Sequence, residues 1–317
     1  MFDVTAVGEL LIDFACRSTD EAGYPTMKAN PGGAPGNFLA ALNAYGCSTA
    51  LLGKVGDDTF GHLLLETLRS AGIEARGVVC DPAVFTTLAF VTFNAAGDRQ
   101  FTFARKPGAD TCLRYEELDL SLIDQCRDFH FGTLSLTDDP ARTATRKAVA
   151  RAKEKGKLIS FDPNLRKPLW SDLETAKREI LWGLHQADIV KISDEETSFL
   201  WGCSPKEAAA RLHEEFGVTV AFVTLGPKGC LYSANGACGI VDNPPAVTVD
   251  TTGAGDIFGG SALSRLLMLN KPLNTLTDVE LRNAATFACW AASLSTERAG
   301  GISSVPPLDV VLSHMKG

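Results

Sequence analysis

Short apolar runs rich in β-branched residues alternate with longer segments of helical pattern along most of the chain. The short runs predict strands at residues 2–7, 49–55, 129–132, 158–161, 187–192 and 220–224. The longer segments predict helices at 38–45, 140–155, 261–267 and 278–296, and another helix that ends near Gly72. Strands and helices alternate from residue 129 onward. This order predicts an α/β fold in which helices cover a parallel sheet.

The period of the pattern changes between residues 86 and 103. Two β-prone runs, 88–93 and 100–103, flank a turn at 94–99 that contains a glycine, and this predicts a β-hairpin. Two adjacent strands without an intervening helix do not fit a wound parallel sheet. We therefore expect a small separate sheet, joined by the stretch near residues 22–29. One further short strand is expected at 246–249.

Composition narrows the classes of function. The chain has 317 residues, 45% of them hydrophobic, which is enough to bury a large core. Its net charge is −8 and it has no basic tract, which argues against a nucleic-acid partner. No apolar segment reaches the length of a membrane span, and the first residues do not resemble a signal peptide. The nine cysteines lack metal-binding spacing, as expected of reduced thiols in a cytoplasmic protein.

A glycine-rich loop at residues 251–256 carries the most specific chemistry. Its sequence is Thr-Thr-Gly-Ala-Gly-Asp, and a predicted helix follows it. Backbone N–H groups at a helix N-terminus bind anions, and small residues leave these groups accessible. The Asp256 carboxylate would repel a phosphate unless it takes a proton from an attacking hydroxyl, so the loop suits phosphoryl transfer to an alcohol. The alternative is an ordinary turn with Asp256 as the helix N-cap.

Two other segments place polar groups where ligands gather in α/β folds. Asp13 follows the first strand closely, and the carboxyl ends of strands form the usual ligand-binding edge of such sheets. Gly32 and Gly33 precede Asn37 at the start of a helix, where bare backbone and an amide can contact a bound molecule. Plainer alternatives are a surface carboxylate for Asp13 and a Pro-Gly loop for the glycines.

These motifs resemble the PfkB (ribokinase-like) family of sugar kinases. The resemblance rests on Asp-Thr-Thr-Gly-Ala-Gly-Asp at 250–256 and on Gly-Gly-x-x-x-Asn at 32–37, and it extends from residue 8 to residue 306. It implies a ribokinase-like fold in one domain spanning 1–317, with a central, mostly parallel sheet flanked by helices. A small β-sheet lid would be inserted at about 14–30 and 84–106.

The resemblance also implies the roles of individual residues. Asp256 is the catalytic base, and the amides of Gly253, Ala254 and Gly255 form the anion hole. The implied sugar-binding residues are Asp13, Gly32, Gly33, Asn37, Arg105, Arg166 and Asp256. The implied ATP-binding residues are Asn164, Lys191, Glu196, Thr224, Gly226, Gly229, Gly253, Gly255 and Cys289.

The resemblance also implies sites for two metal ions. In the family, the residue at Glu196 acts on Mg²⁺ through water; here Glu196 also fits a capping box with Ser193, and both roles can hold. A monovalent cation such as K⁺ would be held by Asp250, Thr252, Ser295, Arg298, Gly300 and Ser304.

Two further runs resemble the fructokinase branch of the family. They are Arg-x-Pro-x-Ala-Asp at 105–110 and Asp-Pro-Asn-x-Arg at 162–166. The expected reaction is ATP-dependent phosphorylation of D-fructose to D-fructose 6-phosphate. Ribose, 2-keto-3-deoxygluconate or a nucleoside are alternative substrates. Relatives that take acidic sugars also use arginines, so an aldonate-derived substrate stays open. A homodimer formed through the lid is a further expectation.

Two other classes of protein are alternatives to a kinase. A dinucleotide-dependent dehydrogenase would need Gly-x-Gly-x-x-Gly after the first strand, but Glu9 and Leu10 follow Gly8 there. A sugar-binding module without catalytic activity is the remaining alternative, and it differs from a kinase in showing no ATP turnover.

Overall fold

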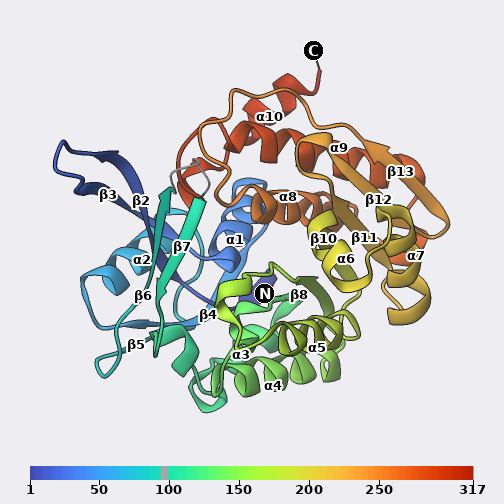
Figure 1. The fold of residues 1–317 in the computed structure, drawn as a ribbon. Helices are drawn as coiled ribbons and strands as arrows, with labels where there is room; N and C mark the ends of the chain where they lie inside the picture. Colours follow the sequence, from blue (N-terminus) through green and yellow to red (C-terminus); the bar gives the residue numbers. More distant parts are fainter. Residues whose placement is uncertain (94–98, 317) are drawn as a thin grey trace.

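The computed structural model describes residues 1–93 and 99–316 (Figure 1). Within these residues, nine strands form the main sheet in the order β13-β12-β11-β10-β9-β8-β1-β4-β5. Neighbouring strands are parallel from β11 to β5, whereas β12 pairs antiparallel with β11 and β13. Their bounds are β1 Phe2–Val7, β4 Thr49–Gly56, β5 Val78–Asp81, β8 Cys126–Gly132, β9 Leu158–Asp162, β10 Ile189–Ser193, β11 Val220–Thr224, β12 Cys230–Ala234 and β13 Ala237–Val241. The predicted α/β fold with a mostly parallel sheet is confirmed.

Helices cover both faces of this sheet. One face is covered by α1 (Ala34–Ala44), α2 (Thr59–Ser70), α8 (Ala254–Met268) and α9 (Asp278–Ser295), with α10 (Leu308–His314) packed on α9. The other face is covered by α3 (Leu120–Asp124), α4 (Ala141–Glu154), α5 (Leu173–Leu184), α6 (Asp194–Trp201) and α7 (Pro205–Phe216). None of the helices in the described residues has the length and hydrophobicity needed to cross a bilayer.

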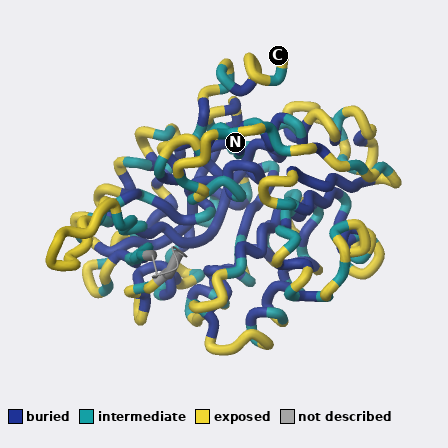
Figure 2. The backbone as a smooth tube through the Cα atoms, turned by 45° about the horizontal axis from the view of Figure 1, so that its top comes forward, coloured by how far each residue is buried: buried dark blue, intermediate teal, exposed yellow. Residues whose placement is uncertain are grey.

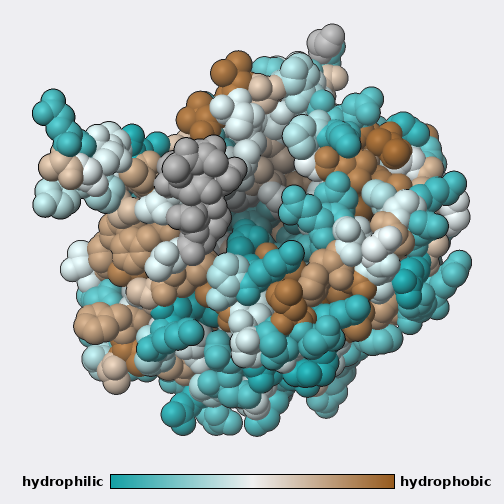
Figure 3. Space-filling model, in the orientation of Figure 1, coloured by the Kyte–Doolittle hydropathy of each residue, from teal (hydrophilic) through white to brown (hydrophobic). Residues whose placement is uncertain are grey.

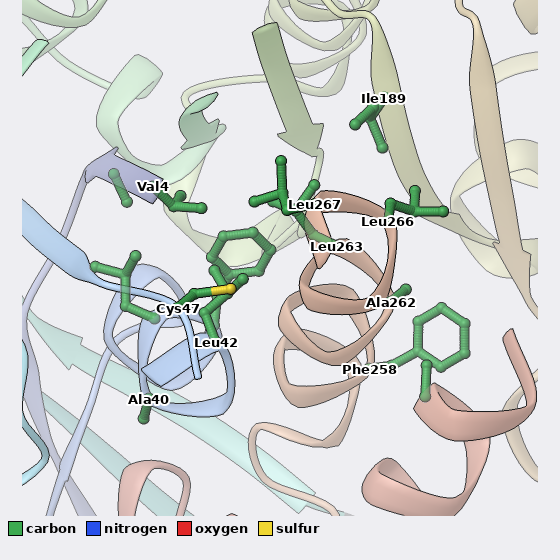
Figure 4. Close-up of a cluster of buried hydrophobic side chains, with 14 of the residues drawn as sticks. Val4, Ala40, Leu42, Cys47, Ile189, Phe258, Ala262, Leu263, Leu266 and Leu267 are labelled. Atoms are coloured by element: carbon green, nitrogen blue, oxygen red, sulfur yellow. The ribbon is translucent and has the colours of Figure 1, made fainter. Parts of the chain in front are cut away.

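Each face of the sheet packs against its own hydrophobic cluster. One of these clusters holds helices α1 and α8 in place. In that cluster Leu263 and Leu267 of α8 pack with Leu42 of α1 and Val4 of β1 (Figure 4). Close packing of this kind tolerates little displacement. The N-termini of α1 and α8 are therefore held side by side.

A second, four-stranded sheet stands apart from the main sheet, with the order β3-β2-β6-β7 in the described residues. Its strands are β2 (Leu11–Thr19), β3 (Pro25–Gly32), β6 (Thr87–Phe93) and β7 (Arg99–Ala104), and we call it the lid sheet. The hairpin predicted at 86–103 is confirmed by the antiparallel pairing of β6 with β7, although turn residues 94–98 lie outside the described part. The exposed tip of β2 and β3 projects from the body (Figure 2).

Two expectations about local structure were wrong. Residues 246–249 form no strand, and the N–H groups of Val249 and Asp250 instead donate to the Thr296 carbonyl at 2.8 and 3.0 Å. Asp13 does not lie in a connection after β1, because β2 begins at Leu11 and runs through Asp13 into the lid sheet. In both segments, hydrogen bonds to distant parts of the chain determine the backbone structure, and local propensity does not.

Candidate active site

The glycine-rich loop forms the N-terminus of α8. Gly253 is the N-cap with φ 78°, so Asp256 is the third residue of the helix and not its cap. A side chain at Gly253 would be strained by this left-handed φ, and its Cβ would come within 3.0 Å of the Asn37 amide nitrogen. The N–H groups of a first turn have no partners within the helix and point towards any anion bound there. The alternative of a simple N-cap at Asp256 is thereby excluded.

Two amides from distant segments hold the Asp256 carboxylate. Asn37 of α1 donates from Nδ2 to Oδ2 at 2.9 Å, and Asn164, just after β9, donates from Nδ2 to Oδ1 at 3.0 Å. Burial raises the pKa of Asp256, whereas these two amides and the charges of Lys191 and Arg166 lower it. Burial outweighs these effects, so the pKa of Asp256 lies above its usual value, and the two amides orient a carboxylate that can accept a proton.

The loop at 251–256 separates two cavities. The larger cavity, of about 560 Å³, touches Ala254 and Gly255, and the second, of about 330 Å³, touches Gly253 and Asp256. Thr251 borders both. Because of its lining we call the second the polar cavity. The molecule is hollowed beside the lid sheet, with hydrophilic residues at the bottom of the hollow (Figure 3).

Several of the residues predicted to bind the nucleotide line the larger cavity. Thr224, Gly226 and Gly229, which follow β11, line it together with Cys289 of α9. Further lining residues that the sequence did not single out include Pro244, Pro245, Phe258 and Ala292. A mostly apolar slot that ends at a helix N-terminus suits a flat base with an anionic tail.

The polar cavity collects most of the residues predicted to bind the sugar. Asp13, Gly33, Asn37, Arg166 and Asp256 all line it. Burial raises the pKa of Asp13 to about 6, although the charge of Arg166 opposes this. Gly32 lies against Asp13, since a Cβ at this glycine would overlap the carboxylate. These groups can accept from and donate to the hydroxyls of a small polar ligand.

Lys191 and Asp162 form a buried ion pair next to the loop. Lys191 Nζ lies 3.0 Å from Asp162 Oδ2, and it would lie 3.0 Å from a Cβ placed on Gly255. Burial lowers the pKa of Lys191, but Asp162, Glu196 and Asp256 outweigh this and leave it above its usual value. The ammonium therefore stays charged beside the anion-binding turn.

Glu196 joins two segments of the site. Its Oε1 accepts the Leu165 N–H at 2.7 Å, and its Oε2 accepts the Ser193 N–H at 2.8 Å. The Ser193 hydroxyl in turn accepts the Glu196 N–H at 3.2 Å, which confirms the capping box. Through its bond to Leu165, Glu196 positions the turn that carries Asn164 and Arg166. Asn164 thus contacts the base and the polar cavity, whereas the sequence assigned it to the nucleotide.

The structure does not bring Arg105 to the polar cavity. Its guanidinium is buried and engaged on all sides: Nε donates to Asp110 at 2.8 Å, Nη1 to Thr137 at 2.8 Å and Nη2 to the Leu134 carbonyl at 2.8 Å. Leu134 itself lines the cavity. Arg105 therefore supports the cavity wall from behind, and no direct contact with a ligand follows from its position.

Only some of the residues predicted to hold a monovalent cation are joined to one another by hydrogen bonds. Asp250 Oδ1 accepts the Thr252 N–H at 3.0 Å and its hydroxyl at 2.7 Å, and Asp250 Oδ2 accepts the Gly300 N–H at 3.2 Å. The Ser295 and Ser304 hydroxyls donate to the carbonyls of Ala292 and Gly301, and the Arg298 N–H donates to the Ser295 carbonyl. Asp250, Thr252 and Gly300 thus form one cluster.

Sequence reasoning missed two buried carboxylates near the base. Glu9 lines the polar cavity, and Asp162 lies at the end of β9 against Lys191. Both lie at the carboxyl ends of strands, Glu9 two residues after β1 and Asp162 as the last residue of β9, so the strand-end rule that singled out Asp13 applied to them as well. Phe103 of β7 also lines the polar cavity, which brings the lid sheet into the site.

An oriented carboxylate beside a helix N-terminus, between a mostly apolar cavity and a polar cavity, is typical of one class of enzyme: a kinase that transfers a phosphoryl group to an alcohol. More particularly, the chain belongs to the pfkB family of carbohydrate kinases, whose family description matches residues 1–308.

Individual relatives agree with this assignment over almost the whole chain. Fructokinase-2 of Solanum lycopersicum is 39% identical over 318 aligned positions, covering 99% of this chain and 96% of the relative. Fructokinase-1 of Zea mays is 40% identical, covering 96% and 94%. The fructokinase from Vibrio cholerae O395 with bound fructose, ADP and calcium superposes with a TM-score of 0.87 at 30% identity, covering 98% of each chain. A putative ribokinase II from E. coli with ATP and Mg²⁺ gives a TM-score of 0.88 at 28% identity, covering 100% and 99%, so the fold is ribokinase-like.

Proposed function

We propose that the chain is an ATP-dependent fructokinase that converts D-fructose to D-fructose 6-phosphate. The observation that carries this proposal is the position of Asp256. Its carboxylate lines the polar cavity, while Ala254 and Gly255 of the same turn line the larger cavity. A hydroxyl in the first cavity and a terminal phosphate in the second would meet at this turn.

The proposed step uses the residues of that turn in distinct roles. Asp256 takes the proton from the sugar hydroxyl while the hydroxyl oxygen forms a bond to the γ-phosphorus and the bond to ADP breaks. The N–H groups at Gly253, Ala254 and Gly255, with the Lys191 ammonium beside them, stabilise the charge on the transferred phosphoryl group. Phe103 of the lid sheet lines the polar cavity and limits the access of water to it.

The charges in the polar cavity favour a neutral sugar. Three carboxylates, those of Glu9, Asp13 and Asp256, line it, and Arg166 is the one cation among its described lining residues. Because Arg105 is paired to Asp110 behind the cavity wall, a sugar acid would meet a net negative environment. This disfavours 2-keto-3-deoxygluconate. Fructose is placed before ribose because the curated relatives are named fructokinases and a solved neighbour holds fructose.

The residues present fit Mg²⁺ that is held mainly by the nucleotide. No group of three or more His, Cys, Asp or Glu side chains in the described residues is arranged as a metal site, and Mg²⁺ commonly binds through phosphates, waters and one or two carboxylates. Each oxygen of Glu196 accepts one N–H and retains a lone pair for a metal-bound water. When bound, Mg²⁺ neutralises phosphate charge. The oxygen-rich cluster of Asp250, Thr252 and Gly300 supports a K⁺ site nearby.

The remaining expectations also belong to this proposal. A single kinase domain with lid segments at about 14–30 and 84–106 is supported by lid strands within residues 11–32 and 87–104. A homodimer through the lid is supported by the exposed tip of β2 and β3. A cytoplasmic location is supported by nine free cysteines, all of which lie in described residues.

The test compares the wild type with Asp256→Asn in an ATP-turnover assay containing fructose, ribose or 2-keto-3-deoxygluconate. We expect fructose to give the highest kcat/KM, and Asp256→Asn to lower kcat roughly 100-fold or more while sugar still binds. Asp309→Asn is the matched control, because Asp309 lies in the first turn of α10 outside the site, and it should keep wild-type activity. No turnover with any sugar would reduce the chain to a binding module. Higher kcat/KM for another sugar would refute fructose alone.

A further inference from the structure

A third, small cavity adjoins the polar cavity and shares Glu9, Asn164 and Asp256 with its lining. Its volume is about 10 Å³, close to the space that one water molecule occupies. Four titratable side chains line it: Glu9, His130, Asp162 and Asp256. We call it the inner cavity. A polar space of this size with several hydrogen-bonding partners is suited to an internal water molecule.

The lining suits water better than a metal ion. No metal-binding group of three or more His, Cys, Asp or Glu side chains occurs among the described residues. Burial lowers the pKa of His130 to about 3, so its ring is neutral at physiological pH, and its Nδ1 lies 2.9 Å from the Ser160 hydroxyl. Asp162 is already paired with Lys191 at 3.0 Å. Glu9 and Asp256 are therefore the two carboxylates of this lining that are not paired with a cation.

Glu9 lies where the inner cavity meets the polar cavity. It lines both, as does Asp256, and its side chain is 3% exposed. Its Oε1 accepts the Ala34 N–H at 2.7 Å, which fixes the carboxyl group at the start of α1. Glu9 thus shares the inner cavity with Asp256, and it also lines the polar cavity, which opens to solvent.

The charge state of Glu9 depends on groups from several elements. Burial raises its pKa to about 7; the Ala34 N–H and Arg105 oppose this, and Asp110 adds to it. Around the inner cavity it faces Asp162 with its partner Lys191, Asp256 and the neutral His130. Across the polar cavity it faces Asp13 and Arg166. Near neutral pH a substantial fraction of Glu9 is therefore ionised and able to accept a proton.

We propose that a water molecule in the inner cavity passes the proton that Asp256 removes from the sugar on to Glu9. This rests on the proposed kinase function. Protonated Asp256 gives its proton to the water, and the water gives one of its own protons to the Glu9 carboxylate, so the water is unchanged and Asp256 is again ionised. Glu9 releases the proton to solvent through the polar cavity once the sugar phosphate has left. Glu9 acts through Asp256 and the water, as a positioning and proton-accepting residue.

The first test is Glu9→Gln, which keeps an oxygen to accept the Ala34 N–H but cannot take up the proton. In single-turnover assays from pH 5.5 to 9, we expect the rate at pH 8 to fall about 10-fold or more and the rate change centred near pH 7 to disappear. The KM values for fructose and ATP should stay within about twofold. Glu9→Asp, which restores a carboxylate, should recover a pH-dependent rate. Glu179→Gln is the matched control, a buried glutamate in α5 paired with Arg146, and it should keep the wild-type profile.

The outcomes separate this inference from the proposed function. If the wild type phosphorylates fructose but Glu9→Gln keeps the wild-type pH profile, the proton path is refuted and the kinase assignment stands. A raised KM for fructose with an unchanged single-turnover rate would make Glu9 a sugar ligand instead. Should Glu9→Gln fail to fold, a high-resolution crystal structure of the wild type decides. An ordered water within hydrogen-bonding distance of both the Glu9 and Asp256 carboxylates supports the path, and a dry inner cavity overturns it.

Discussion

Removing one of the two amides that hold the base should change its pKa measurably. In Asn164→Gly the 3.0 Å hydrogen bond from Asn164 Nδ2 to Asp256 Oδ1 is lost. Asn164 has φ 46°, a left-handed conformation that glycine adopts without strain, so the backbone turn is retained. The hydrogen bond favours ionised Asp256, and its loss must raise the pKa of that carboxyl group.

The magnitude follows from the strength of such a bond. A hydrogen bond to a charged group contributes roughly 1.5–3 kcal/mol, and one pKa unit corresponds to about 1.4 kcal/mol. We therefore expect the pKa of Asp256 to rise by about 1–2 units. In the proposed mechanism Asp256 accepts a proton only when it is ionised, so on acidification Asn164→Gly should lose activity at a higher pH than the wild type does. The loss should shrink towards alkaline pH, where both proteins are ionised at this position.

The assay measures the pKa directly. The carboxyl carbon of Asp256 is followed by ¹³C NMR in aspartate-labelled protein between pH 3 and pH 9, and the spectrum of Asp256→Asn assigns the signal. Asn270→Gly is the matched control: Asn270 also has a left-handed φ, 49°, but lies in the connection after α8. An Asp256 pKa that stays unchanged or falls in Asn164→Gly would show that this amide does not support the ionised base.

Two further predictions concern the residues around the polar cavity. In Arg105→Met the buried Asp110 carboxylate loses its partner, so urea unfolding should give a free energy of unfolding lower by about 3–5 kcal/mol. The KM for fructose should change less than about twofold. A rise in this KM without loss of stability would place Arg105 at the sugar. Burial raises the pKa of Asp13 to about 6, and in the proposed sugar site its ionised form accepts hydrogen bonds from the sugar. The KM for fructose should therefore rise roughly tenfold per pH unit as the pH falls below 6, with the KM for ATP unchanged. Asp13→Asn should abolish this dependence, and a KM that is flat from pH 7 to pH 5 in the wild type would exclude Asp13 as a charged acceptor.

The strands, the helices and the glycine-rich loop could be predicted because their signals are local. A run such as 220–224 has β-branched residues between turn residues and forms β11. Ser193 and Glu196 lie three residues apart and form the predicted capping box. In each case the interacting groups are neighbours in sequence, so propensity and spacing contain the required information.

The absence of a strand at 246–249 and the position of Arg105 both depend on contacts that the local sequence does not show. Residues 246–249 have a β-prone composition, but their backbone bonds to the end of α9, and Val247 and Val249 remain exposed. Arg105 lies in a motif that resembles a sugar-binding one, yet Asp110, five residues on, and Thr137 draw its guanidinium into the core. The local sequence identifies a candidate residue, whereas contacts with distant segments determine where its side chain lies.

The base shows most clearly what a local motif omits. The loop at 251–256 supplies Asp256 and the anion-binding turn, but the orientation and ionisation of the carboxylate come from Asn37, 219 residues away, and Asn164, 92 residues away. Glu196 holds the turn of Asn164, and the core between α1 and α8 holds Asn37 beside the loop. Since each support comes from a different segment of the chain, a glycine-rich loop transferred to another scaffold would keep its anion site and lose the oriented carboxylate. In the proposed mechanism, catalysis therefore depends on the convergence of three distant segments of the chain at Asp256.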